Sequence, residues 1–192
     1  KEGRSSLKRA KTGTTALSRD VSSAKIRQKL LEMTGDPDDR VLFQLLCTLG
    51  TNVDEPVFAA LAKITLANIE DSWFQIAALS AAPVSGSAWL QAVQREPGFL
   101  SSPSRGKEGF LRRAASVVGA KQDSRETAAV LAAVSCPTGA DWWRVATLAG
   151  LSEGIQRGGR KQVSLLPAAQ ATLSGLLDAS PKVVSAALGL IE

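Results

Sequence analysis

The sequence predicts an all-α protein that is built as an α-solenoid of stacked, antiparallel helix pairs. Three observations predict this fold class. Alanine and leucine are abundant, while strand-length runs of alternating β-branched residues are missing. Turn-forming residues recur about every 12–20 residues along the chain. Five segments also share one internal pattern at intervals of about 31–40 residues.

The predicted helices lie between these turns. The first covers 22–34, in which Ile26, Leu30 and Leu31 recur at helical spacing. Five further helices contain the similar segments, namely 44–50, 75–81, 113–119, 144–150 and 184–190. Second helices alternate with them at 54–67, 86–95, 123–135 and 163–178. One repeat is therefore a helix, a short turn and an antiparallel helix.

Acidic residues mark where several of these helices begin. An aspartate at the first turn stabilises the exposed backbone amides, and the sequence offers Asp38, Asp54, Asp71, Asp123 and Asp141 at such places. Asp36 and Asp39 complete an acidic cluster with Asp38, which lacks the ligand spacing of a calcium loop. We interpret this cluster as helix capping.

The third position of the repeated pattern is small in four of five repeats. It is occupied by Leu46, Ala77, Ala115, Ala146 and Ala186. A small side chain there lets a neighbouring helix approach closely, so each pair can stack on the next into an α–α superhelix. The period is near that of HEAT repeats, at about 40 residues, and tetratricopeptide and ankyrin signatures are absent. An ordinary helical bundle is the alternative.

Charge divides the chain into two parts. Residues 1–29 hold nine Lys/Arg against Glu2 and Asp20, whereas the remainder carries a net charge of −2. We predict a basic N-terminal segment at 1–20, either disordered or part of an incomplete repeat, and a HEAT-like repeat domain at 21–192. A nearly neutral body argues against nucleic acid as a partner. The chain also lacks an apolar run of about 18 residues, so no membrane span is expected.

Composition argues against most enzyme classes. The chain has no His and no Tyr, and its two cysteines, Cys47 and Cys136, are far apart. A histidine base, a His-ligated metal or haem and a paired-cysteine site are thereby excluded. We predict no catalytic, cofactor-binding or metal-binding residues, with Cys47 buried within a helix and Cys136 exposed and oxidisable in a loop.

Four tryptophans are the most informative large side chains. Trp73 is expected to pack in the core between repeats. Of the adjacent Trp142 and Trp143, one should be buried and the other partly exposed, since neighbours on a helix face different sides. The candidate interaction surface consists of Trp89, Arg95, Trp142 and Arg144. Two short basic stretches, Arg112-Arg113 and 157–161, are expected to be ordinary helix surface and a helix end.

Four stretches together resemble one family. They are DPDDRVLFQLLCTLG (36–50), FAALAKITLANIEDSWFQIAALSA (58–81), VVGAKQDSRETAAVLAAV (117–134) and WWRVATLAGLSEGIQRGG (142–159). They look like the HEAT-repeat segment of PQQ-type, membrane-bound-dehydrogenase-like proteins, which join a β-propeller, a HEAT segment and a haem-c cytochrome domain. The resemblance implies a spacer excised from a larger, exported or periplasmic protein; without it the chain is expected to be cytoplasmic. CxxCH and the propeller repeats are missing here, so the family's redox chemistry is not carried over.

The first functional hypothesis is a non-catalytic scaffold that binds a protein or a neighbouring domain of the same parent chain. Its binding surface should be formed by the successive second helices. The alternative is a HEAT-like DNA-binding protein or alkylpurine DNA glycosylase, with a site around Asp141, Trp142, Trp143 and Arg144. An electron-transfer or dehydrogenase subunit is disfavoured because cofactor ligands are lacking. The oligomeric state stays open.

Overall fold

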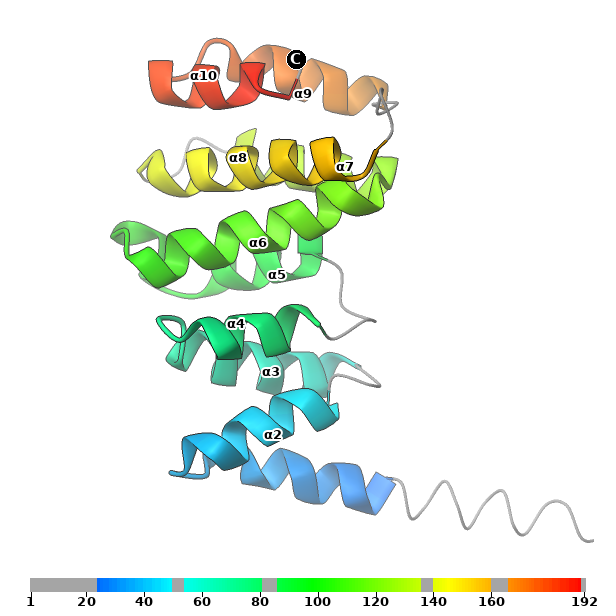
Figure 1. Ribbon diagram of the computed structural model, residues 1–192, viewed down its shortest axis with the longest axis vertical. Coiled ribbons are helices and arrows are strands. Elements are labelled where there is room, and N and C mark those ends of the chain that lie inside the picture. Colours follow the sequence, from blue (N-terminus) through cyan, green and yellow to red (C-terminus); the bar gives the residue numbers. More distant parts are fainter. Residues whose placement is uncertain (1–23, 50–53, 81–85, 136–139, 160–165, 191–192) are drawn as a thin grey trace, which may run out of the picture.

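The computed structural model describes residues 24–49, 54–80, 86–135, 140–159 and 166–190 (Figure 1). Within these ranges the regular structure is helical, without strands, which confirms the all-α prediction. Residues 24–32 are helical and lead into the short 3₁₀ helix η1 (Met33–Gly35). The following elements are α2 (Asp39–Leu49), α3 (Glu55–Ala67), α4 (Ser72–Leu79), α5 (Gly86–Arg95), η2 (Phe99–Ser101), α6 (Arg105–Lys121), α7 (Ser124–Ser135), α8 (Trp142–Arg157), α9 (Pro167–Leu176) and α10 (Pro181–Leu188). The predicted boundary between residues 20 and 21 lies outside the described residues.

The helices form two rows along the long axis of the molecule. In the view of Figure 1, α2, α4, α6, α8 and α10 lie in front and α3, α5, α7 and α9 lie behind. Each helix contacts its neighbours in its own row, as α6 does with α4 and α8, and also contacts helices of the other row, as α6 does with α5 and α7. We call these the even row and the odd row. One face of each row is therefore turned outward.

Local chemistry explains several of the helix starts. The Asp54, Asp71 and Asp123 carboxylates accept hydrogen bonds from backbone amides of the first turns of α3, α4 and α7, and Asp38 does the same for α2. The predicted capping role of these four aspartates is confirmed. Asp141 is different, because its carboxylate makes no capping bond and instead accepts one from the Arg144 guanidinium at 3.3 Å.

The core runs between the two rows and is tied together by aromatic contacts. Trp89 of α5 lies between Phe58 of α3 and Phe110 of α6, with ring centroids 5.1 and 5.5 Å away and edge-on geometry. Phe43 and Phe74 make a similar contact between α2 and α4. Such edge-on pairs add to the free energy of burial.

Glycines provide the closest approach of two helices. A Cβ atom at Gly150 of α8 would lie 2.1 Å from the Arg112 carbonyl oxygen of α6, and one at Gly154 would lie 2.1 Å from that of Ser116. The prediction that recurring alanines carry the tight contacts holds only in part. Ala77 and Ala115 are buried, whereas Ala146 and Ala186 are half-buried beside fully buried neighbours.

Candidate functional site

The outward face of the even row carries two adjoining grooves. The first, of about 590 Å³, lies between α4, α6 and the C-terminal half of α8. The second, of about 910 Å³, lies between α6, the N-terminal half of α8 and the start of α10. Gly109 and Arg112 of α6 line both. Because the grooves share this wall, they form one surface across four helices, which we call the even-row groove.

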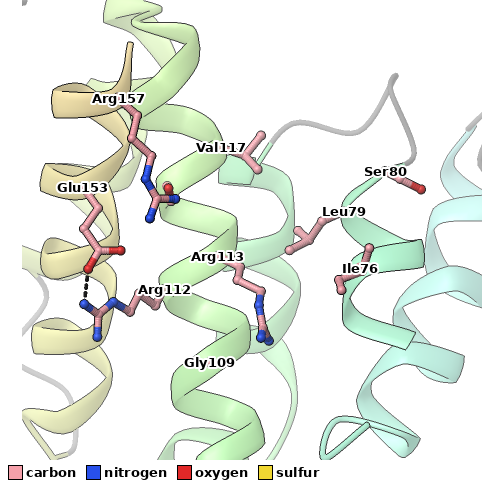
Figure 2. Close-up of a pocket in the computed structure, with 10 residues that line it drawn as sticks. Ile76, Leu79, Ser80, Gly109, Arg112, Arg113, Val117, Glu153 and Arg157 are labelled. Atoms are coloured by element: carbon pink, nitrogen blue, oxygen red, sulfur yellow. Dashed lines mark hydrogen bonds and ion pairs between the residues drawn. The ribbon is translucent and has the colours of Figure 1, made fainter. Parts of the chain in front are cut away.

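Helix α4, which borders this surface, carries two exposed apolar side chains. Trp73 is 68% exposed and Ile76 is 48% exposed, and both belong to α4. The predicted core position of Trp73 is wrong: the buried face of α4 is formed by Phe74, Ala77 and Ala78, and Trp73 points to another side of the helix. Ile76 lines the first groove together with half-buried Leu79 (Figure 2).

Gln75 connects this border to α6 from inside the protein. Its side chain is buried and donates to the carbonyl oxygens of Ile69, at 2.5 Å, and of Gly106, at 3.0 Å. Its own carbonyl oxygen accepts a hydrogen bond from the Arg113 guanidinium. A buried amide with every group engaged is held rigidly, so Gln75 positions Arg113 toward α4.

An ion pair joins α6 to α8 at the centre of the surface. The Arg112 guanidinium donates to the Glu153 carboxylate, as the dashed line in Figure 2 shows. This hydrogen bond lowers the pKa of Glu153, and the charges of Arg112 and Arg157 lower it further. Arg157, one helical turn beyond Glu153, makes no ion pair with any of the described residues. Its positive charge therefore remains available at the groove.

The second groove contains a partly exposed tryptophan. The Trp142 indole donates to the Leu100 carbonyl oxygen at 3.3 Å, while Trp143 is buried, as expected for adjacent positions. The nearby Ser180 hydroxyl, and then Arg144 and Lys182, lower the pKa of Asp141. This end of the groove combines an indole face with both signs of charge.

The four residues predicted as an interaction surface do not come together. Trp89 is only 1% exposed and lies in the aromatic core, so it offers no surface. Arg144 is 7% exposed and donates to the Val134 carbonyl oxygen at 2.7 Å, which makes it structural. Arg95 is exposed at the end of α5 in the odd row. Only Trp142 lines the even-row groove.

Other sequence predictions have mixed outcomes. Cys47 is exposed, not buried, because it lies on the outer side of α2 next to buried Leu45 and Leu46. Cys136 and residues 160–161 lie outside the described residues. The acidic cluster acts in turn and cap geometry as predicted, since Asp36 accepts from the Asp38 amide. Across the described ranges, His, Cys, Asp and Glu form no group of three or more that could hold a metal ion.

The sequence gives no sign of a role for Ile76 and Gln75, and it shows Arg157 only as part of the basic stretch 157–161. The sequence shows Arg112 and Arg113 as a basic pair, but nothing in their spacing shows that α8 supplies Glu153 and Arg157 opposite them.

Considering the helices within the described ranges, none is both long and apolar enough to cross a membrane. Comparisons with protein-family models, with curated proteins and with solved structures found no match.

Proposed function

We propose that this chain is a non-catalytic HEAT-like repeat scaffold, an α-solenoid whose outer surface binds a protein or a neighbouring domain of its parent chain. The arrangement of helices in two rows, each helix packed on its neighbours, is consistent with stacked helix pairs. Such a stack holds its surface rigid over several repeats, which suits recognition by shape and scattered polar contacts.

The observation that carries this proposal is the composition of the even-row groove. Exposed Ile76 lines the groove together with Arg112 and Arg113. Trp73, also exposed, lies one turn earlier on α4. Tryptophan and arginine are enriched at protein–protein interfaces, and exposed apolar side chains at a groove mark places that partners cover. This groove lies on the first helices of the repeats, not on the second helices where the sequence predicts the binding surface.

The resemblance to the HEAT segment of dehydrogenase-like proteins adds a specific form of the proposal. In a chain of that architecture, the partner would be a neighbouring domain, and this segment would set the distance between domains. Domain interfaces within a chain resemble transient protein interfaces, which are more polar than obligate ones. A groove that mixes arginines with apolar side chains is of this kind.

The DNA-glycosylase alternative receives less support. Of the four residues on which it depended, Trp143 and Arg144 are buried, and Asp141 accepts a hydrogen bond from Arg144. The even-row groove also contains Glu108, Asp141 and Glu153. Carboxylates placed among the cations oppose the approach of a phosphate backbone.

An unbiased peptide library displayed against the 192-residue protein tests the proposal. We expect saturable binders, and we expect nuclear magnetic resonance shifts on their addition to concentrate at Ile76, Arg113 and Val117. A short duplex DNA is titrated in parallel. Duplex binding at physiological salt that is tighter than that of every selected peptide would contradict the proposal, as would a selection that yields no saturable binder.

A further inference from the structure

We infer that the groove between α4, α6 and α8 receives an acidic, amphipathic helix of a partner protein. This inference rests on the proposed scaffold function and names the class of partner for its binding surface.

The floor of the groove is apolar and spans two helices. Ile76 and Leu79 lie one turn apart on α4, and Val117 lies opposite them on α6 (Figure 2). The volume of about 590 Å³ is within the range of pockets that bury ligand side chains. A partner must therefore present apolar side chains, which a helix offers from one face at positions i, i+3, i+4 and i+7.

The charges that line this groove are unequally compensated. Arg112 is paired with Glu153, so that pair is nearly neutral as a unit. Arg113 is held by the neutral amide of Gln75, which fixes its direction but leaves its positive charge uncompensated. Arg157 makes no ion pair in the described part of the chain. Two positive charges thus flank the apolar floor, and carboxylates on the partner complement them.

A helix fits this surface better than other partners. The described residues contain helices and turns but no strand, so they offer no strand edge on which an extended peptide could add. Nucleic acid would find few aromatic faces here, since the apolar floor is aliphatic and Glu153 lies beside the arginines. An amphipathic helix with acidic flanks satisfies both the floor and the two arginines.

The test uses fluorescein-labelled helical peptides of about 16 residues with leucines on one face. One peptide carries glutamates beside the leucine face, a second carries lysines there, and a third replaces the leucines by serine. We expect only the glutamate peptide to bind the wild-type protein, with an affinity that falls as salt is raised. The R113E/R157E variant should weaken it at least about tenfold and should instead bind the lysine peptide.

Two controls keep the result interpretable. The R95E/R125E variant makes the same change in total charge on the odd row, and we expect it to leave glutamate-peptide binding unchanged. The neutral R113Q/R157Q variant should weaken glutamate-peptide binding less than the R113E/R157E variant does. Circular dichroism checks that every variant folds. Stronger binding of the lysine peptide by the wild-type protein would overturn the inference. An equal loss in the R95E/R125E variant, or displacement of the peptide by tighter-binding duplex DNA, would also overturn it.

The two proposals fail in different ways. If library selection yields binders without acidic residues, or binders located on the odd row, the scaffold function stands and the acidic-helix inference is wrong. If neither the library nor the designed peptides give saturable binding, both are wrong.

Discussion

Replacement of Gly150 by alanine tests how closely α6 and α8 pack. The new Cβ atom would lie 2.1 Å from the Arg112 carbonyl oxygen and 2.8 Å from the Arg112 carbonyl carbon and Cα. These are backbone atoms within a long helix, so no flexible side chain can turn away. An ordinary contact begins at 3.4 Å, and α8 must therefore move away from α6.

Two effects of opposite sign determine how much G150A changes the free energy of unfolding. Alanine in place of glycine within a helix stabilises by about 1 kcal/mol. Overpacking in a core typically costs about 1–3 kcal/mol and occasionally more, and contact with the backbone of α6 places Gly150 at the upper end. We therefore expect G150A to lower the free energy of unfolding by about 2 kcal/mol. Gly175 of α9 is the matched control, because its added Cβ would meet nothing within 4 Å.

Urea unfolding followed by circular dichroism measures both variants. We expect G175A to unfold at a higher urea concentration than the wild-type protein, by virtue of helix propensity alone. G150A should unfold at a lower concentration, and its thermal midpoint should fall by roughly 2–4 °C per kcal/mol. A G150A protein that is as stable as the G175A protein would refute the close approach of the two helices.

Three further predictions follow from burial, capping and charge. Trp89→Ala should cost about 3–5 kcal/mol of stability in chemical unfolding, whereas Trp73→Ala should change it by less than about 0.5 kcal/mol, since only Trp89 is buried. Ser104→Ala should cost about 1 kcal/mol, because Ser104 caps α6 through the Lys107 amide, while exposed Ser102→Ala should be neutral by thermal unfolding. The pKa of Glu153 is lowered in the folded protein, so its contribution to stability is present above the ordinary value of 4.5 and is lost as the pH falls below it. Unfolding across an acid titration should show a smaller loss for the E153Q variant than for the wild-type protein.

The positions of the helices could be predicted because their causes are local. Asp54, Asp71 and Asp123 mark helix starts through bonds to amides two or three residues away, which the sequence displays directly. The contact of α6 with α8 could not be predicted in this way. It depends on the contact of Gly150 and Gly154 with α6, which lies more than thirty residues earlier in the chain. The sequence around a glycine does not show which distant helix it will contact.

The candidate site could be predicted only in fragments, for a related reason. Trp89 and Trp73 look alike as large aromatic residues in amphipathic helices, and a shift of one position around a helix decides between core and solvent. In α4 the buried face begins at Phe74, so the preceding Trp73 is exposed. Gln75 was missed because a polar residue within an apolar run gives no sign that its amide will hold Arg113.

The glycine contact and the charges of the groove are parts of one arrangement. Along α8, Gly150 and Gly154 admit the backbone of α6, and Glu153 and Arg157 occupy neighbouring positions of the same helix edge. The close approach brings Glu153 within reach of Arg112, which neutralises one arginine and leaves Arg113 and Arg157 as the uncompensated cations. Separating the helices at Gly150 should therefore weaken the Arg112–Glu153 pair as well as the core. We expect G150A to change glutamate-peptide affinity even when the variant is fully folded, whereas G175A should leave that affinity at the wild-type value.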